Sequence, residues 1–91
     1  MMEVRSGFGA AVFKGMIFVL GGEIIISGLE TLDSVEVFDP ETGNWSFAPP
    51  MPFALHGVPA AVSDEALYVL GGADEAGTAN NSGRTLVYGN W

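Results

Sequence analysis

The sequence predicts an all-β protein built from a repeated unit of short antiparallel strands. The first observation behind this is a near-duplication: FVLGG at 18–22 returns as YVLGG at 68–72. The second is the presence of 13 glycines and 5 prolines in 91 residues, which suits many tight turns between short strands. The third is a hydrophobic content of 48%, which is too high for a chain that is disordered by composition.

The two copies of the unit align without a gap when each residue n is set beside residue n+50. Identical residues recur along most of that alignment rather than at the glycines alone. The matching positions are 10–12 with 60–62, 19–22 with 69–72, Gly7 with Gly57, and Val37 with Val87. A period near 50 residues is typical of proteins assembled from stacked structural repeats.

The first half of the unit contains two strand candidates joined by a turn. Residues 7–13 (GFGAAVF) are small and apolar, and KG at 14–15 is a turn dipeptide. Residues 16–20 (MIFVL) form a short run rich in β-branched and aromatic side chains, as a buried strand requires. We expect residues 23–32 to form a loop, although EIII at 23–26 could extend the strand.

The second half of the unit adds two more strand candidates. DSVEVFD at 33–39 alternates, so its two valines should face one side of a sheet, with Glu36 and Phe38 on the other. PETGN at 40–44 contains the proline and glycine of a turn, and WSFA at 45–48 follows as a fourth strand.

The second unit repeats three of these four strands, over 57–62, 66–70 and 84–88. Four antiparallel strands in about 50 residues make one blade of a β-propeller. The sequence therefore predicts an all-β fold of antiparallel four-stranded blades, arranged as a partial propeller of about two blades. We expect residues 1–50 to form the first blade and residues 51–91 a second blade that lacks its fourth strand.

The glycine doublet that ends the second strand of each unit has a structural explanation. Gly21 and Gly22 lack a Cβ, so they can adopt positive φ, turn the chain sharply out of the sheet and admit close backbone contact between neighbouring blades. The rival explanation is a phosphate-binding loop. That loop requires a GxGxxG or GxxxxGK[ST] string between a strand and a helix, and the sequence contains neither string.

These features together resemble the kelch repeat. In that family a blade has an apolar run, a glycine doublet, an aromatic residue on the third strand and a tryptophan on the fourth. The matching residues are Gly21, Gly22, Phe38 and Trp45 in the first unit, and Gly71, Gly72 and Tyr88 in the second. The phrase LDSVEVFDPETGNWSFAPPMP at 32–52 is similar to the family consensus along its whole length.

The sequence also departs from the kelch pattern. Phe38 stands where the family commonly has tyrosine, so the first unit lacks a hydroxyl that Tyr88 keeps in the second. Trp91 follows Tyr88 too closely to be the equivalent of Trp45, and for this reason the second unit is expected to lack its outer strand. We expect Trp45 and Phe47 to fill space between blades.

Two blades cannot close a ring, because propellers usually have four to eight. Three outcomes are open: the chain is a fragment of a longer kelch protein, copies of it complete a ring, or it forms another oligomer through strand pairing. Because the sequence begins with methionine and is presented whole, we expect self-association that completes the ring, with further blades of a longer chain as the alternative.

Charge and composition exclude several classes of partner. The formal net charge is −8, and the positive residues are only Arg5, Lys14 and Arg84, which disfavours binding to nucleic acid or to an anionic membrane. Cysteine is absent, so there is neither a disulfide framework nor a thiolate metal site. No signal peptide or membrane-spanning run is visible, and we expect a cytoplasmic protein.

The kelch resemblance implies where a ligand would bind. In kelch-like binding propellers, the loops that lead into the first strand and those that follow the glycine doublet line one mouth of the ring. By this resemblance, Arg5, Ser6 and His56 are the best candidates for contact with a peptide or protein ligand. The alternatives are that Arg5 and Ser6 are ordinary solvated turn residues and that His56 is a turn or interface histidine.

The loops after the two doublets differ in character. Residues 73–84 are polar, and Asp74, Asn80 and Asn81 offer oxygen atoms that could contact a partner or bind Ca²⁺ weakly. Their spacing matches no EF-hand loop, so we expect a hydrated surface loop and neither a metal nor a cofactor. By contrast, residues 24–26 are three isoleucines, which form a strand end, a core plug or a partner surface.

Three functional hypotheses follow. The favoured one is a non-enzymatic interaction module that presents its loops to a peptide or protein. The second is a fragment of a kelch-like sugar-processing enzyme of the oxidase or sialic-acid isomerase type. The oxidase version needs tyrosine, histidine and cysteine ligands, but the chain has no cysteine, and one histidine without a visible nucleophile makes no catalytic set. The third is a structural remnant that folds only by assembling.

Overall fold

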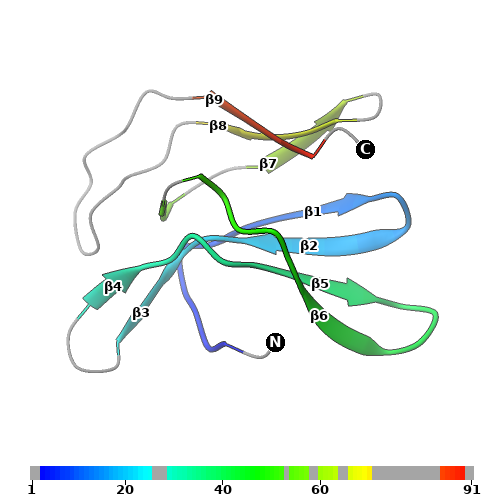
Figure 1. Cartoon of the computed structure of the whole chain (residues 1–91), viewed down its shortest axis with the longest axis horizontal. Coiled ribbons are helices and arrows are strands. Elements are labelled where there is room, and N and C mark those ends of the chain that lie inside the picture. The colour runs from blue at the N-terminus through cyan, green and yellow to red at the C-terminus, as the bar shows by residue number, and fades with distance from the viewer. Residues whose placement is uncertain are drawn as a thin grey trace.

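The computed structural model describes residues 3–25, 29–52, 54–57, 60–63, 66–70 and 85–89. Over these residues the chain forms nine β-strands and no helix. Two sheets lie one above the other, and a small hairpin extends from one end of the lower sheet (Figure 1). The structure therefore confirms the all-β fold of antiparallel blades in a partial propeller of about two blades.

The first sheet has four antiparallel strands in the order β1-β2-β5-β6. Their bounds are Gly9–Phe13 for β1, Met16–Leu20 for β2, Val35–Asp39 for β5 and Asn44–Ala48 for β6. Tight turns join neighbours: Lys14 and Gly15 both have positive φ (53° and 76°) between β1 and β2. We call this sheet the first blade.

The segment expected to be a loop between β2 and β5 contains a separate hairpin. Strand β3, Glu23–Ile25, pairs antiparallel with β4, Leu29–Thr31, in a two-stranded sheet. The expectation of a loop was therefore wrong for residues 23–25 and 29–31, and Glu23–Ile25 begins a new sheet rather than extending β2. The glycine doublet separates the two sheets, since Gly21 and Gly22 turn the chain out of the first blade before β3 begins.

The second sheet has three strands among the described residues, in the order β7-β8-β9. They span Ala60–Ser63, Ala66–Leu70 and Thr85–Gly89. The β8–β9 register shifts between Leu67 and Tyr68, as at a β-bulge. We call this sheet the second blade. From Tyr68 onward its register repeats that of the first blade, since Val69 pairs with Leu86 in the same way that Val19 pairs with Glu36.

The hydrophobic core lies between the two blades. The first blade contributes the side chains on its covered face, which are Phe13, Phe18, Leu20, Val35 and Val37. The second blade contributes Leu67 and Val69, and the chain that connects the blades contributes Met51 and Leu55. Partly buried residues on the margin include Ala60 and Tyr88. Burial of apolar side chains from both sheets is thus what holds the blades together.

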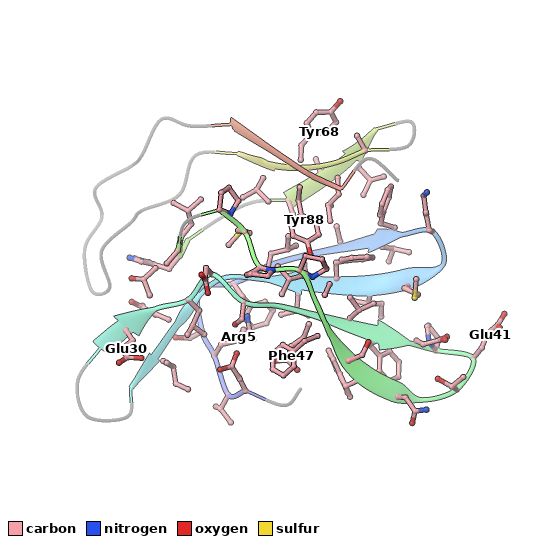
Figure 2. The ribbon with its side chains drawn as sticks, viewed as in Figure 1. Arg5, Glu30, Glu41, Phe47, Tyr68 and Tyr88 are labelled. Atoms are coloured by element: carbon pink, nitrogen blue, oxygen red, sulfur yellow. The ribbon has the colours of Figure 1, made fainter. Side chains whose placement is uncertain are left out.

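No blade lies against the other face of the first blade among the residues that the structure describes, and we call it the open face. The strand registers place on it Ala10, Val12, Ile17, Val19, Glu36, Phe38, Trp45 and Phe47. Phe38 and Trp45 pack on each other with ring centroids 5.0 Å apart, whereas Phe47 is 54% exposed. Figure 2 shows Phe47 pointing away from the second blade. Phe47 was expected to fill space between blades, but it does not do so in this chain.

The glycine doublet is required by close contact where the two blades meet. Gly21 and Gly22 have φ of 63° and 99°, the left-handed region that glycine enters without strain. A Cβ on Gly21 would overlap the carbonyl oxygen of Leu55, and one on Gly22 would lie 2.7 Å from the carbonyl oxygen of Ser6. Any side chain here would force the backbone segments apart.

Candidate functional site

The structure brings the segments that lead into the two blades side by side. Ser6 forms an antiparallel bridge with Glu23, the first residue after the glycine doublet, through backbone hydrogen bonds of 3.0 and 2.8 Å. The Gly57 amide donates to the carbonyl of Gly7 at 2.6 Å, which joins the second segment to the first. Ser6 and His56, which occupy equivalent positions of the two units, therefore lie on neighbouring segments.

The two candidate residues differ in exposure. Ser6 is exposed, whereas His56 is only 6% exposed. The His56 Nδ1 atom lies 3.9 Å from a carboxylate oxygen of Glu23, so the histidine contacts the chain that leaves the first blade. This is the position of an interface histidine, with Ser6 as the more accessible group for a ligand.

Arg5 is buried rather than solvated. Its side chain has no exposed surface, and its Nη2 atom lies 2.8 Å from Glu36 and 2.9 Å from Glu3. The Nη1 atom donates to the backbone carbonyls of Gly21 at 2.8 Å and Ser34 at 3.0 Å. The interpretation of Arg5 as a solvated turn residue was wrong, because its guanidinium is buried and forms ion pairs with Glu3 and Glu36.

This ionic cluster ties the N-terminal segment to the first blade. Glu36 has a fully buried side chain, accepts a hydrogen bond from the backbone amide of Glu3 at 3.0 Å and pairs with Arg5. Ser34 donates from its hydroxyl to Glu3 at 2.6 Å. A carboxylate is tolerated at such a buried position when it is both ion-paired and hydrogen-bonded.

A sequence signal for this pair was available but was missed. At the n+50 positions, Arg5 corresponds to Leu55 and Glu36 corresponds to Leu86. Both members of the ion pair are thus replaced together by leucine in the second unit. Such a joint exchange indicates that the two positions are in contact, which the alternation of β5 alone could not reveal.

A shallow depression of about 310 Å³ lies beside Ser6. It is lined by Val4, Arg5, Ser6, Glu23 and Ile24. The Arg5 guanidinium backs this depression without reaching solvent, and Val4 is 84% exposed. The depression therefore presents a serine, a glutamate and two aliphatic side chains, and no accessible cation from the described residues.

Tyr88 lies between the two blades and contacts both. Its ring meets Phe18 edge-on with centroids 6.1 Å apart, and its hydroxyl donates to the carbonyl of Pro49. Burial raises the pKa of Tyr88 from 10.0 to about 12. Figure 2 shows Tyr88 between the blades and Tyr68 pointing away from them.

Several predicted site residues lie outside the described residues. These are Gly71, Gly72, Asp74, Asn80 and Asn81. Among the residues that the structure does describe, no group of three or more histidine, cysteine, aspartate or glutamate side chains could hold a metal ion. Within the same residues, no helix is long and apolar enough to cross a membrane.

Comparison with known proteins identifies the family. The Kelch motif model matches residues 5–52, and the chain belongs to the kelch-repeat family. It is 39% identical over 67 residues to Kelch-like protein 35 of Homo sapiens, covering 74% of this chain and 11% of that protein. It is 36% identical over 88 residues to Kelch-like protein terF of Aspergillus terreus, covering 92% of this chain and 19% of that protein.

A solved structure shows the same fold. The structure of YjhT superposes with a TM-score of 0.71 at 26% sequence identity, covering 78% of this chain and 21% of that one. The chain therefore spans between about a tenth and a fifth of the length of the relatives named here. The resemblance read from the glycine doublets and aromatic residues is confirmed.

Proposed function

We propose that this chain is a non-enzymatic kelch module that binds a peptide or protein at the edge where Ser6 and His56 meet. The observation that supports it is the junction of the two units: equivalent positions are held together by the hydrogen bond from Gly57 to Gly7. Family membership supports a role in protein interaction, because kelch-like relatives share this unit. Ser6 supplies an exposed hydroxyl, and the neighbouring depression can take a side chain.

The proposal also assigns the chain to two units of a larger ring. Residues 1–50 and 51–91 act as two kelch units of one partial propeller, and further units complete the ring. Copies of this chain, or further blades of a longer one, supply them. Asp74, Asn80 and Asn81 are further candidates for contact with the partner, and the protein acts in the cytoplasm.

A selection experiment tests the binding site. The full chain is used to select ligands from a displayed peptide library, and the selected peptide is titrated against Ser6→Lys and Thr42→Lys. Ser6 and Thr42 are both exposed, but Thr42 lies in the β5–β6 turn at the other end of the first blade (Figure 1).

We expect Ser6→Lys to weaken binding at least tenfold and Thr42→Lys to leave it unchanged. Equal affinity for both variants would contradict the assignment of the site. Turnover of a sugar by the wild-type chain would contradict the non-enzymatic part of the proposal.

A further inference from the structure

The contact between the two blades shows how a further blade could pack on the open face of the first blade, and we call this contact the template. The second blade covers the first with the face that carries Ala60, Leu67, Val69 and Tyr88. The n+50 alignment makes Ala10, Ile17, Val19 and Phe38 their equivalents, and the strand registers place these four on the open face of the first blade. This kind of face is therefore covered in the second blade, whereas in the first blade Ala10 is exposed, Ile17 and Phe38 are half-buried, and Val19 is buried.

Two pairs of equivalent side chains differ in exposure between the two blades. Ile17 is half-buried, whereas its equivalent Leu67 is completely buried. Ala10 is exposed, whereas Ala60 packs against the core. The open face therefore has side chains of the right kind, at the right register, for a sheet to cover them.

The segment that leads into each blade shows the same contrast. Val4 is 84% exposed, whereas its equivalent Ala54 is half-buried. Ser6 is exposed, whereas its equivalent His56 is buried. Leu55 is hydrogen-bonded to Gly22 and Leu32, at the turn that leaves the first blade, whereas Val4 and Ser6 on either side of the buried Arg5 remain exposed.

Backbone hydrogen bonds make the template specific. In the second unit, Leu55 accepts from the Gly22 amide at 2.8 Å and donates to the carbonyl of Leu32 at 3.2 Å. Arg5 stands at the Leu55 position of the first unit. No backbone hydrogen bond joins Arg5 to any other residue in the described part of the chain. In the same pair of bonds with another unit, the Arg5 carbonyl would accept from a backbone amide and the Arg5 amide would donate to a backbone carbonyl.

The outward face of the second blade is the natural counterpart. Tyr68 lies on it, at the position equivalent to Phe18, and points away from the first blade (Figure 2). Within the chain, Phe18 meets Tyr88 edge-on, and Phe38 is the equivalent of Tyr88 on the open face. A second copy placed by the template would therefore bring its Tyr68 ring against Phe38.

We propose that the open face of the first blade and residues 4–6 bind the outward face of the second blade of another copy, in the pose that the two blades adopt within one chain. The proposal rests on the proposed function and deepens it by naming the surfaces through which the units assemble. The contact is head-to-tail, so two or three copies can close a ring of four or six blades.

The experiment uses the full chain and three variants. Ala10→Asp places a charge at an exposed position of the open face, and Tyr68→Asp places one on the outward face of the second blade. Thr42→Asp adds the same charge in an exposed turn away from both surfaces. The molecular mass in solution is measured by light scattering, and far-ultraviolet circular dichroism checks that each variant remains folded. Ile17→Asp provides a second variant of the open face.

We expect the wild type and Thr42→Asp to be dimers or trimers, and Ala10→Asp, Ile17→Asp and Tyr68→Asp to be monomers of 9.5 kDa. An equimolar mixture of Ala10→Asp and Tyr68→Asp should form a dimer that grows no further, because each pair of chains retains one intact head-to-tail contact. A contact between two open faces would instead leave Tyr68→Asp as oligomeric as the wild type, which would overturn the proposal.

A monomeric wild type would also overturn it. That result would leave peptide binding at Ser6 untouched, whereas a ring-forming chain that selects no peptide would contradict the proposed function alone.

Discussion

Replacing Arg5 with leucine should cost the chain much of its stability. The substitution leaves Glu36, whose side chain is fully buried, without its 2.8 Å partner. Removing one partner of a buried ion pair typically costs about 3–5 kcal/mol, because the remaining charge is neither paired nor hydrated. The carbonyls of Gly21 and Ser34 also lose their donor. We therefore expect Arg5→Leu to fall at the upper end of that range.

The double substitution should recover most of this loss. Arg5→Leu with Glu36→Leu installs the pair of residues that the second unit has, where Leu55 is completely buried. Replacing a buried ion pair by apolar residues of similar volume is often neutral or stabilising. Glu3 would keep its hydrogen bond with Ser34 and remain partly exposed, so it needs no buried partner.

Urea unfolding of the wild type, the two single variants and the double variant measures the coupling directly. Urea carries no charge, so it leaves the ion pair unscreened. We expect the double variant to unfold at a free energy at least about 2 kcal/mol above that of Arg5→Leu, consistent with strong coupling between contacting residues. A free energy of unfolding for Arg5→Leu within about 1 kcal/mol of the wild type would refute the reasoning, as would a double variant no more stable than that single variant.

Three further predictions concern the interface between the blades. Gly21→Ala should destabilise the chain by more than about 2 kcal/mol, because the added Cβ would overlap the carbonyl oxygen of Leu55. Gly15 has open space around it, so Gly15→Ala should cost only the ~1–2 kcal/mol of placing an alanine in the left-handed region. Thermal unfolding of both variants compares the two losses of stability. Tyr88→Phe should cost about 0.5–1.5 kcal/mol through loss of the hydrogen bond to Pro49, measured by urea unfolding. Because the pKa of Tyr88 is raised from 10.0 to about 12, the folded state keeps the phenolic proton to a higher pH than the unfolded state does. The free energy of unfolding should therefore fall as the pH rises through that interval, and it should fall less steeply in Tyr88→Phe. Equal slopes of the free energy of unfolding against pH in the two proteins would contradict burial of the hydroxyl.

The main strands could be predicted because their sequences carry strong local signals. Apolar runs such as Met16–Leu20 end at glycine doublets, and Val35–Asp39 alternates along its length. The repeat then supplied a second, independent copy of the pattern. The errors lay at the ends, where β1 begins at Gly9 and β5 at Val35, each two residues later than expected.

The β3–β4 hairpin could not be predicted because three-residue strands are too short to show a period. Glu23–Ile25 and Leu29–Thr31 are distinguished from a loop only by pairing with each other. The bulge in the β8–β9 pairing likewise depends on how two strands meet rather than on either sequence.

At the candidate site, sequence reasoning proposed a segment that stays a prediction, and it misjudged the burial of Arg5. Ser6 and His56 could be placed together because the repeat gives them equivalent positions. The burial of Arg5 could not be predicted from its neighbours in the sequence, because its partner Glu36 lies 31 residues away on strand β5. A charge is stable inside a blade only when such a partner is present, and this is a property of the folded contact.

The most direct test of the two-blade account is a nuclear Overhauser spectrum of the full chain. Stacked blades predict cross-peaks between the ring protons of Phe18 and Tyr88, whose centroids are 6.1 Å apart, and between the Gly7 and Gly57 segments. The same spectrum should show the pairing of β1 with β2 within the first blade. Cross-peaks within each sheet, with none between Phe18 and Tyr88, would show that the blades do not stack and would contradict the account.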